Sequence, residues 1–232
     1  AKTICCPRFI YISASPLVPG SPVINLRESA SGSQLPRHLY PRTKAIAERT
    51  VLAANGSEFT TISLSPPLIW GPENHHAEEM LDRVRAGKWM WIGGGEQILS
   101  SIHVKNLAAA VLAALQQGRG GEAYFVTDGD RRPLKQTLSA IFGAYGLDAG
   151  DKAIPIGLAA FLAGACDLIW RGLGLRSRPP IPPLAIRLMG REFSVNDQKA
   201  RRELDYQNAI QFEEGIAELR ALYHPDAKVR KD

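Results

Sequence analysis

The sequence predicts an α/β fold built on a parallel sheet. Residues 8–13 (RFIYIS) form an apolar, β-branched run that is typical of a short buried strand. Residues 40–56 (YPRTKAIAERTVLAANG) carry apolar side chains at helical spacing and finish with an Asn-Gly pair that stops a helix. Residues 59–65 (FTTISLS) indicate a second strand, closed by the two prolines that follow. Strand, helix and strand in this order make the βαβ unit of a parallel sheet.

The remainder of the chain continues to alternate between short apolar runs and helical patterns. Loops are expected over 16–37 and 68–76, and a strand with a turn over 88–95. Helices are predicted over 77–87, 104–118, 132–146, 194–206 and 211–223, with another strand over 121–129.

Length and composition indicate an ordinary globular protein. The 232 residues suit one large domain or two small ones, and 45% of them are hydrophobic and 22% charged. The net charge is +5, without a basic stripe interleaved with aromatic residues, which argues against nucleic-acid binding. The three cysteines, Cys5, Cys6 and Cys166, lack metal-site spacing, and their odd number disfavours a disulfide framework. A reducing cytoplasm is therefore the default compartment.

Residues 154–175 are the most hydrophobic stretch of the chain. Their uninterrupted apolar part, Pro155 to Cys166, is 12 residues long, whereas a membrane span needs about 20. Asp167 and Arg171 then interrupt it. We expect a buried helix or a lid over the substrate, with peripheral membrane contact as the alternative.

Tyr40 and Lys44 stand four residues apart at the start of a predicted helix. Residues at this spacing share one helix face, so the two side chains should point into the same space. A free phenol has a pKa of about 10, and a neighbouring ammonium favours the phenolate. Such a pair can relay a proton, and the lysine can donate hydrogen bonds to a ribose. Surface packing of the two side chains is the alternative.

The surroundings of this pair favour the chemical interpretation. The preceding strand ends in Ser13 and Ser15, and the following strand ends in the proline pair. Ligands of open parallel sheets bind beyond the carboxyl ends of the strands. The serines, the helix start and the proline turn should therefore meet at one edge of the sheet.

Eight segments give the chain a resemblance to a known family. They are, in order, FIYISASP, LRES, YPRTKAIAE, LSPPLIWGP, WIGGG, SSIHVKNLAAAV, GGEAYFVTDG and GREFSVNDQKARRELDY. Together they resemble the extended short-chain dehydrogenase/reductase superfamily, in particular its NAD-dependent epimerase/dehydratase and 3β-hydroxysteroid dehydrogenase-like branch. The resemblance implies a Rossmann-like parallel sheet, the C-terminal part of an NAD(P)-binding core, over 1–70 with 101–130 returning to it. It also implies a smaller, mostly helical substrate-binding region over 71–100 and 131–232.

The resemblance also implies roles for individual residues. Tyr40 matches the proton donor and acceptor, and Lys44 matches the residue that binds the nicotinamide ribose and assists the tyrosine. A serine after the first strand should polarise the substrate oxygen. Counting from the strand without a gap puts the family's serine position on Ala14, whereas alignment on the following proline puts it on Ser15. Ser15 is therefore favoured, and Ser13 is kept as a second candidate. The alternative for both serines is that they cap the end of the strand.

Two further positions follow from the same resemblance. Pro67, Leu68 and Ile69 match the turn whose backbone meets the nicotinamide carboxamide, although Ser65 stands where the family often has an arginine. His103 matches a residue near the junction with the substrate domain, and we expect it to be a hydrogen-bonded structural histidine. The adjacent His75 and His76 have no third metal ligand nearby in the sequence and are expected to be loop residues.

One family feature is missing from the sequence. Family members begin with a strand, a glycine-rich turn that cradles the pyrophosphate, and a helix. Here the first glycine is Gly20, which follows the serine strand, and the glycines at 93–95 and 118–121 stand in the wrong order of elements. The chain is therefore expected to begin partway through a Rossmann domain and to bind dinucleotide weakly by itself.

The function predicted from the resemblance is that of an oxidoreductase. It would use NAD or NADP to interconvert a secondary alcohol and a ketone on a hydrophobic, sterol-like substrate, with Tyr40 moving the proton. A nucleotide-sugar epimerase or dehydratase, and a non-catalytic binding protein derived from a dehydrogenase, are the alternatives. The expected partner is a small hydrophobic substrate, while membrane contact through 154–175 and a homodimer are left open.

Overall fold

The computed structural model describes residues 6–14, 22–28, 39–173, 186 and 189–224. The chain divides into two compact units. The first comprises Ala1–Pro72, Ser100–Asp130 and Ser194–Gly215, and the second comprises Glu73–Leu99, Arg131–Phe193 and Ile216–Asp232. Residues 194–215 thus belong with the first unit, whereas the sequence interpretation assigned them to the substrate-binding region. Residues 194–215 belong to the first unit because they contact residues of that unit that are far away in the sequence.

A parallel three-stranded sheet forms the centre of the first unit. Its order is β1 (Arg8–Ile12), β3 (Thr60–Ser65) and β7 (Glu122–Phe125), with β3 in the middle. Helix α1 (Leu39–Ala53) connects β1 to β3, which confirms the predicted βαβ unit and the α/β fold class. The register pairs Tyr11 with Ser63 and Ile12 with Leu64.

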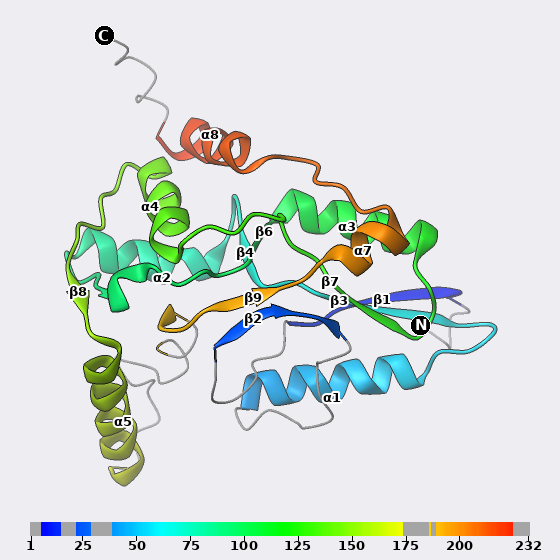
Figure 1. Ribbon diagram of the computed structural model, residues 1–232, viewed down its shortest axis with the longest axis horizontal. Helices are drawn as coiled ribbons and strands as arrows, with labels where there is room; N and C mark the ends of the chain where they lie inside the picture. Colours follow the sequence, from blue (N-terminus) through cyan, green and yellow to red (C-terminus); the bar gives the residue numbers. More distant parts are fainter. Residues whose placement is uncertain (1–5, 15–21, 29–38, 174–185, 187–188, 225–232) are drawn as a thin grey trace. The chain divides into compact units, whose positions relative to one another are not determined.

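The two faces of this sheet differ in chemistry. Because side chains alternate along a strand, Ile62 and Leu64 of β3 share one face and Thr61, Ser63 and Ser65 share the other. The apolar face packs against alanines of α3 (Val104–Gln117) and against Ala200 and Leu204 of α7 (Gln198–Leu204). Figure 1 shows α3 and α7 on one side of the sheet and α1 on the other. Helix α1 therefore meets the hydroxyl-bearing face.

Four short strands form two pairs; one strand of each pair lies where a loop was predicted, and residues 194 and 195 of a third strand lie where a helix was predicted. Strand β2 (Val23–Leu26) pairs with β9 (Phe193–Val195), and β4 (Leu68–Trp70) pairs in parallel with β6 (Ser101–His103). The loop predictions for 16–37 and 68–76 were wrong at these residues. Partners distant in the sequence make these strands: the Asn25 N–H donates to Ser194 Oγ at 2.9 Å, and the Asn196 N–H donates to Leu26 O at 2.8 Å. A local sequence pattern does not reveal such pairing.

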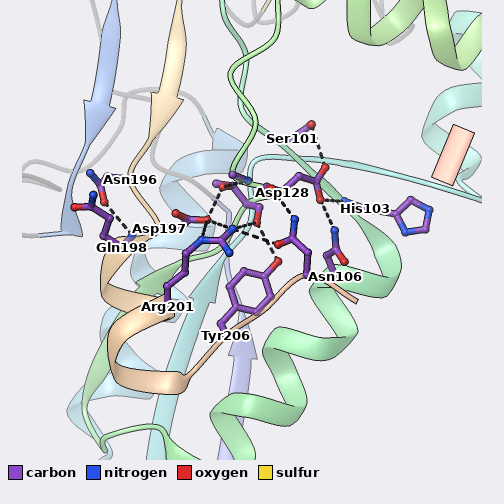
Figure 2. A network of polar contacts seen from close by, with 12 residues as sticks. Ser101, His103, Asn106, Asp128, Asn196, Asp197, Gln198, Arg201 and Tyr206 are labelled. Carbon is purple, nitrogen blue, oxygen red and sulfur yellow. Dashed lines mark hydrogen bonds and ion pairs between the residues drawn. The ribbon is translucent and has the colours of Figure 1, made fainter. Parts of the chain in front are cut away.

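A buried carboxylate, that of Asp128, joins several elements of the first unit (Figure 2). Oδ1 accepts from the His103 N–H at 2.8 Å and from Asn106 Nδ2 at 2.7 Å. Oδ2 accepts from Trp70 Nε1 at 2.7 Å and from Ser101 Oγ at 3.4 Å. The carboxylate thereby ties the ends of β4 and β6 and the start of α3 to the segment that follows β7.

Asp197 continues this network on the other side of the same segment. Its Oδ2 accepts from Thr127 Oγ1 and from Arg201 Nη2, each at 2.8 Å. The buried Tyr206 hydroxyl donates to Thr127 O at 3.0 Å, and burial raises the pKa of Tyr206. These bonds hold α7 and the chain after it against the end of β7 (Figure 2).

The second unit is mainly helical. Its helices are α2 (His75–Arg85), α4 (Leu134–Ala144), α5 (Ile156–Gly172) and the greater part of α8 (Phe212–Tyr223). A two-stranded parallel pair, β5 (Trp91–Ile92) with β8 (Ala153–Ile154), and the 3-10 turn η3 (Gly93–Gly95) complete it. Trp89, Trp91 and Phe142 form an aromatic cluster, with the Trp89 ring 5.4 Å from Trp91 and 5.0 Å from Phe142.

Helix α5 buries only a narrow stripe. Ala159 and Ala163 pack with Ile186, Ile92 and Ile154. Phe161 and Leu168, in contrast, are 71% and 73% exposed, so α5 is not the buried helix that was one of the two expected forms. The other form, a lid over the substrate, stays a prediction. No helix in the described part of the chain is both long and apolar enough to span a bilayer.

The Asp128 network predicts a large loss of stability for Asp128→Asn. The amide would turn a donor toward groups that are themselves donors, and these would stay buried without an acceptor. We expect the free energy of unfolding to fall by about 3 kcal/mol, measured by urea denaturation. Asp205→Asn is the matched control, because Asp205 is exposed and has a positive φ of 53° that asparagine tolerates. If the two substitutions lowered the free energy of unfolding equally, the stabilising role of the Asp128 network would be contradicted.

Candidate active site

Tyr40 and Lys44 lie in the first turns of α1. Tyr40 is 57% exposed, while the adjacent Pro41 is buried against the protein. Proline suits this position because the first N–H groups of a helix have no partner within it. Lys44 Nζ donates to the carbonyl oxygen of Ile12, the last residue of β1, at 3.0 Å. The pair therefore lies at the carboxyl end of β1, where ligands of parallel sheets bind.

Tyr11 lies directly beside this lysine. Lys44 Nζ is 5.3 Å from the centre of the Tyr11 ring, which is a cation–π distance. Burial raises the pKa of Tyr11, and the negative charges of Glu48 and of an ionised Tyr40 raise it further. Tyr11 therefore remains a neutral phenol beneath the ammonium group. The aromatic pattern of the strand alone did not single it out.

The structure describes one of the two candidate serines. Ser13 is buried, and its N–H donates to Leu64 O at 2.8 Å, which extends the β1–β3 pairing by one residue. It follows directly after Ile12, the residue whose carbonyl binds Lys44. Ser15 lies outside the described residues, so the choice between Ser13 and Ser15 as the polarising serine stays a prediction.

Glu48 lies one further turn along α1, on the face that carries Lys44. Its Oε2 accepts from Ser63 Oγ at 2.6 Å and from Ser65 Oγ at 3.1 Å. Both serines belong to β3 and are buried. The sequence interpretation missed this contact. The i, i+4, i+8 series of Tyr40, Lys44 and Glu48, facing a strand with alternating hydroxyls, was a usable signal.

The proline turn after β3 leads into β4. Pro67, Leu68 and Ile69 are partly exposed, and the Leu68 N–H donates to Ser100 O at 3.3 Å. Pro67 has no N–H, and that of Leu68 is used within the protein. The expected contact with the nicotinamide carboxamide stays a prediction, in which backbone carbonyl oxygens of these residues accept hydrogen bonds from the carboxamide.

His103 has a structural position, and the two adjacent histidines singled out in the sequence lie in a helix. His103 is fully buried and precedes α3, where its Nδ1 accepts from the Lys105 N–H at 3.2 Å. Its ring lies 4.6 Å from that of Trp70 in an edge-on arrangement. His75 and His76 open helix α2 and do not lie in a loop as expected. Within the described ranges, no group of three or more His, Cys, Asp or Glu residues is placed to hold a metal ion.

The arrangement brings together a phenol, an ammonium and a carboxylate at one strand end. The ammonium has three donors, of which one binds Ile12 O. Lys44 is only partly buried, so other donors can reach a ligand beyond the strand. The exposed phenol of Tyr40 can give or take a proton there.

The charge placement predicts a change in the titration of Tyr11. Glu48→Gln removes a negative charge that raises the pKa of Tyr11, so that pKa should fall while burial keeps it above its ordinary value. Tyrosine-selective carbon-13 labelling and an alkaline NMR titration, with Tyr11→Phe for assignment, would measure it. Glu58→Gln, an exposed site after α1, is the control. If the pKa of Tyr11 were the same in the Glu48→Gln variant as in the parent protein, the influence of Glu48 on Tyr11 would be refuted.

Several known proteins are similar to this chain over most of its length. A 4-hydroxy-2-methyl-3-oxo-4-farnesyl-3,4-dihydroquinoline-1-oxide ketoreductase of Stigmatella aurantiaca is 36% identical over 92% of the chain. A 2-alkyl-3-oxoalkanoate reductase of Stenotrophomonas maltophilia is 32% identical over 78%. A decarboxylating sterol-4-alpha-carboxylate 3-dehydrogenase of Dictyostelium discoideum is 29% identical over 78%. The chain spans 64%, 57% and 56% of the lengths of these relatives, respectively.

Solved structures share the fold at lower identity. A dTDP-glucose 4,6-dehydratase of Bacillus anthracis in complex with NAD has a TM-score of 0.62 at 17% identity, over 98% of this chain and 65% of its own. A human epimerase family protein with NADPH has a TM-score of 0.67 at 12% identity, over 92% and 65%. The model of the 3-beta hydroxysteroid dehydrogenase/isomerase family matches residues 1–155. With its Tyr40–Lys44 pair at the end of a parallel strand, the chain belongs to this 3-beta hydroxysteroid dehydrogenase/isomerase family.

Proposed function

We propose that this chain carries the acid–base centre of an NAD(P)-dependent oxidoreductase, which interconverts a secondary alcohol and a ketone on a hydrophobic substrate. One observation carries the proposal. Tyr40 and Lys44 share a face of α1, and the hydrogen bond from Lys44 to Ile12 O holds that face at the carboxyl end of β1. Family membership and the names of the relatives support the same reaction class.

The proton steps follow from the side chains. In the reducing direction, the Tyr40 hydroxyl donates a proton to the carbonyl oxygen as hydride reaches the carbonyl carbon, and an alcohol results. In the oxidising direction, the Tyr40 phenolate accepts the hydroxyl proton as hydride leaves the same carbon. The positive charge of Lys44 would offset the negative charge that develops on the Tyr40 oxygen as the proton moves. Ser13 or Ser15 would donate to the substrate oxygen and hold it near Tyr40.

A nicotinamide dinucleotide, NAD or NADP, supplies or accepts the hydride when bound. The residues present fit such a group at one end. Lys44 would hold the ribose through donors other than the one that binds Ile12 O, with the Tyr40 hydroxyl beside it. Backbone oxygens of Pro67, Leu68 and Ile69 would face the carboxamide.

The relatives indicate the substrate class. Their names combine an oxo group or a dehydrogenation with a farnesyl, alkyl or sterol skeleton. We propose a substrate of the same kind, a small apolar compound with a secondary alcohol or a ketone. The alternatives are an epimerase or dehydratase of nucleotide sugars, with which the solved structures share the fold, and a non-catalytic binding protein.

Tyr40→Phe tests the reaction. The substitution removes the proton donor but keeps the ring and the helix, so turnover should fall by about 100-fold or more. Dinucleotide affinity should stay nearly unchanged because Lys44 remains in place. The assay follows NADH and NADPH absorbance in the full-length protein with a 2-alkyl-3-oxoalkanoate and a sterol alcohol. Tyr223→Phe, in the second unit, is the matched control.

Each alternative has its own outcome in this assay. Full turnover by the Tyr40→Phe variant would remove Tyr40 from the proton step and overturn the proposal. Turnover restricted to nucleotide sugars would favour the epimerase or dehydratase. Absence of turnover and of dinucleotide binding in the unsubstituted protein would favour the non-catalytic binding protein.

We also propose peripheral membrane contact through α5. This helix has an exposed apolar surface, of which Phe161 and Leu168 are the most exposed residues. The surface also includes Leu158, Leu162 and Ile169. The sequence carries five arginines between 171 and 191, namely Arg171, Arg176, Arg178, Arg187 and Arg191, and no acidic residue in that range. An exposed apolar helix face in a chain whose following sequence is cationic suits the interface of a bilayer that contains anionic lipid. An oligomer formed through the same surface, such as a homodimer, is the competing explanation.

Vesicle sedimentation tests this contact. Phe161→Glu with Leu168→Glu should lower binding to vesicles of phosphatidylcholine and phosphatidylserine by about tenfold or more, because the two exposed apolar side chains that would enter the bilayer are lost. Leu112→Glu with Leu115→Glu, at exposed positions of α3, is the matched control. A dimer in light scattering that dissociates on the α5 substitution, without vesicle binding by the parent, would instead assign the surface to a second copy.

A further inference from the structure

Helix α1 makes directed polar contacts with the sheet and buries few of its residues fully. Pro41 is its only buried residue, although all residues of α1 lie in the described part of the chain. The face of β3 that it meets carries the buried hydroxyl side chains Thr61, Ser63 and Ser65. Its apolar residues Ala45, Ala47, Val51 and Leu52 are only half-buried, so they interlock with the sheet less than the side chains of a fully packed helix do. Specific hydrogen bonds therefore add to what defines the position of α1.

Glu48 makes two such bonds. Its Oε2 accepts from Ser63 at 2.6 Å and from Ser65 at 3.1 Å. The two serines are alternate residues of one strand, roughly 6.6 Å apart along it, so a carboxylate shared between them is restrained along the strand direction. Hydrogen bonds to an ionised acceptor are also stronger than those between neutral groups. Glu48 thus resists sliding of α1 along β3.

The tether, meaning the hydrogen bonds of Glu48 with Ser63 and Ser65, lies on the face of α1 that carries the proposed proton relay. Tyr40, Lys44 and Glu48 follow at i, i+4 and i+8, on one stripe of the helix about 12 Å long. Lys44 supplies the second attachment, to Ile12 O on β1 at 3.0 Å. One attachment on β3 and another on β1 determine both the rotation and the translation of the helix. Tyr40, at the exposed end of the stripe, depends on both.

We propose that Glu48 is a positioning residue for the acid–base pair. Through Ser63 and Ser65 it sets the place of α1, and thereby the distance between the Tyr40 hydroxyl and the reacting oxygen. This inference rests on the proposed function. A misplacement of about 1 Å at a reacting group can lower the rate by up to about 100-fold. Glu48 touches neither substrate nor cofactor in this role.

Steady-state kinetics of the full-length protein tests the tether. Glu48→Ala should lower kcat by about 10- to 100-fold and change KM by less than roughly threefold, because the loss falls on the transition state. Glu48→Gln should recover most of kcat, since its amide oxygen still accepts from a serine. Glu58→Gln, an exposed glutamate in the loop after α1, should match the parent protein.

Removing the partner hydroxyls gives an independent measurement. Ser63→Ala with Ser65→Ala should reproduce the loss of kcat, and adding Glu48→Ala to this pair should lower kcat no further, because all three groups act as one unit. The serine variant also serves if Glu48→Ala does not fold. Thermal melts would accompany each variant, so that kcat is compared at equal folded fraction.

The outcomes separate this inference from the proposed function. If Tyr40→Phe abolishes turnover but Glu48→Ala and the serine variant keep the parent kcat, the positioning role is wrong and the proposed function stands. The same conclusion holds if the losses from Glu48 and from the serines simply multiply. If Tyr40→Phe retains full turnover, the proposed function itself fails.

Discussion

The buried carboxylate of Asp128 is the interaction on which the first unit depends. A lone charge in a protein interior is costly unless hydrogen bonds replace the lost water. Here the N–H of His103 and the side chains of Trp70, Ser101 and Asn106 replace it. Asn208 Nδ2 also donates to the Asp128 carbonyl, at 2.6 Å. The donors to the carboxylate come from β4, β6 and α3, so one side chain holds together elements that are far apart in the sequence. The main-chain carbonyl of the same residue adds the segment after α7.

The two faces of the central sheet have different roles: one packs into the apolar core and the other positions α1. Ile62 and Leu64 pack against α3 and α7, and this apolar packing supplies much of the burial that drives folding. On the opposite face, hydroxyl groups and Glu48 hold α1 by directional bonds. Hydrogen bonds fix distances and angles more narrowly than apolar contact does. The proton transfer proposed for Tyr40 would benefit from that narrow definition.

Residues outside the pair shape the environment of Lys44. The Tyr11 ring and the Ile12 carbonyl both face its ammonium group, and both lie on β1. A neutral ring and a carbonyl dipole stabilise a cation without neutralising it by a full negative charge. This environment suits the proposed contact of Lys44 with a phenolate or a ribose. Membership of the 3-beta hydroxysteroid dehydrogenase/isomerase family agrees with such a use.

The sequence by itself determined the βαβ unit, because periodicity and turn residues are local, and it singled out Tyr40 and Lys44 by their spacing on one helix face. The short strands β2 and β4 could not be predicted, since bonds to residues distant in the sequence create them. The same limit hid Glu48, whose partners lie on β3. It also hid the exposure of α5, because composition shows that a helix is apolar and only packing shows which side is covered. Tertiary structure decided these features because each depends on which residues distant in the sequence lie within contact distance.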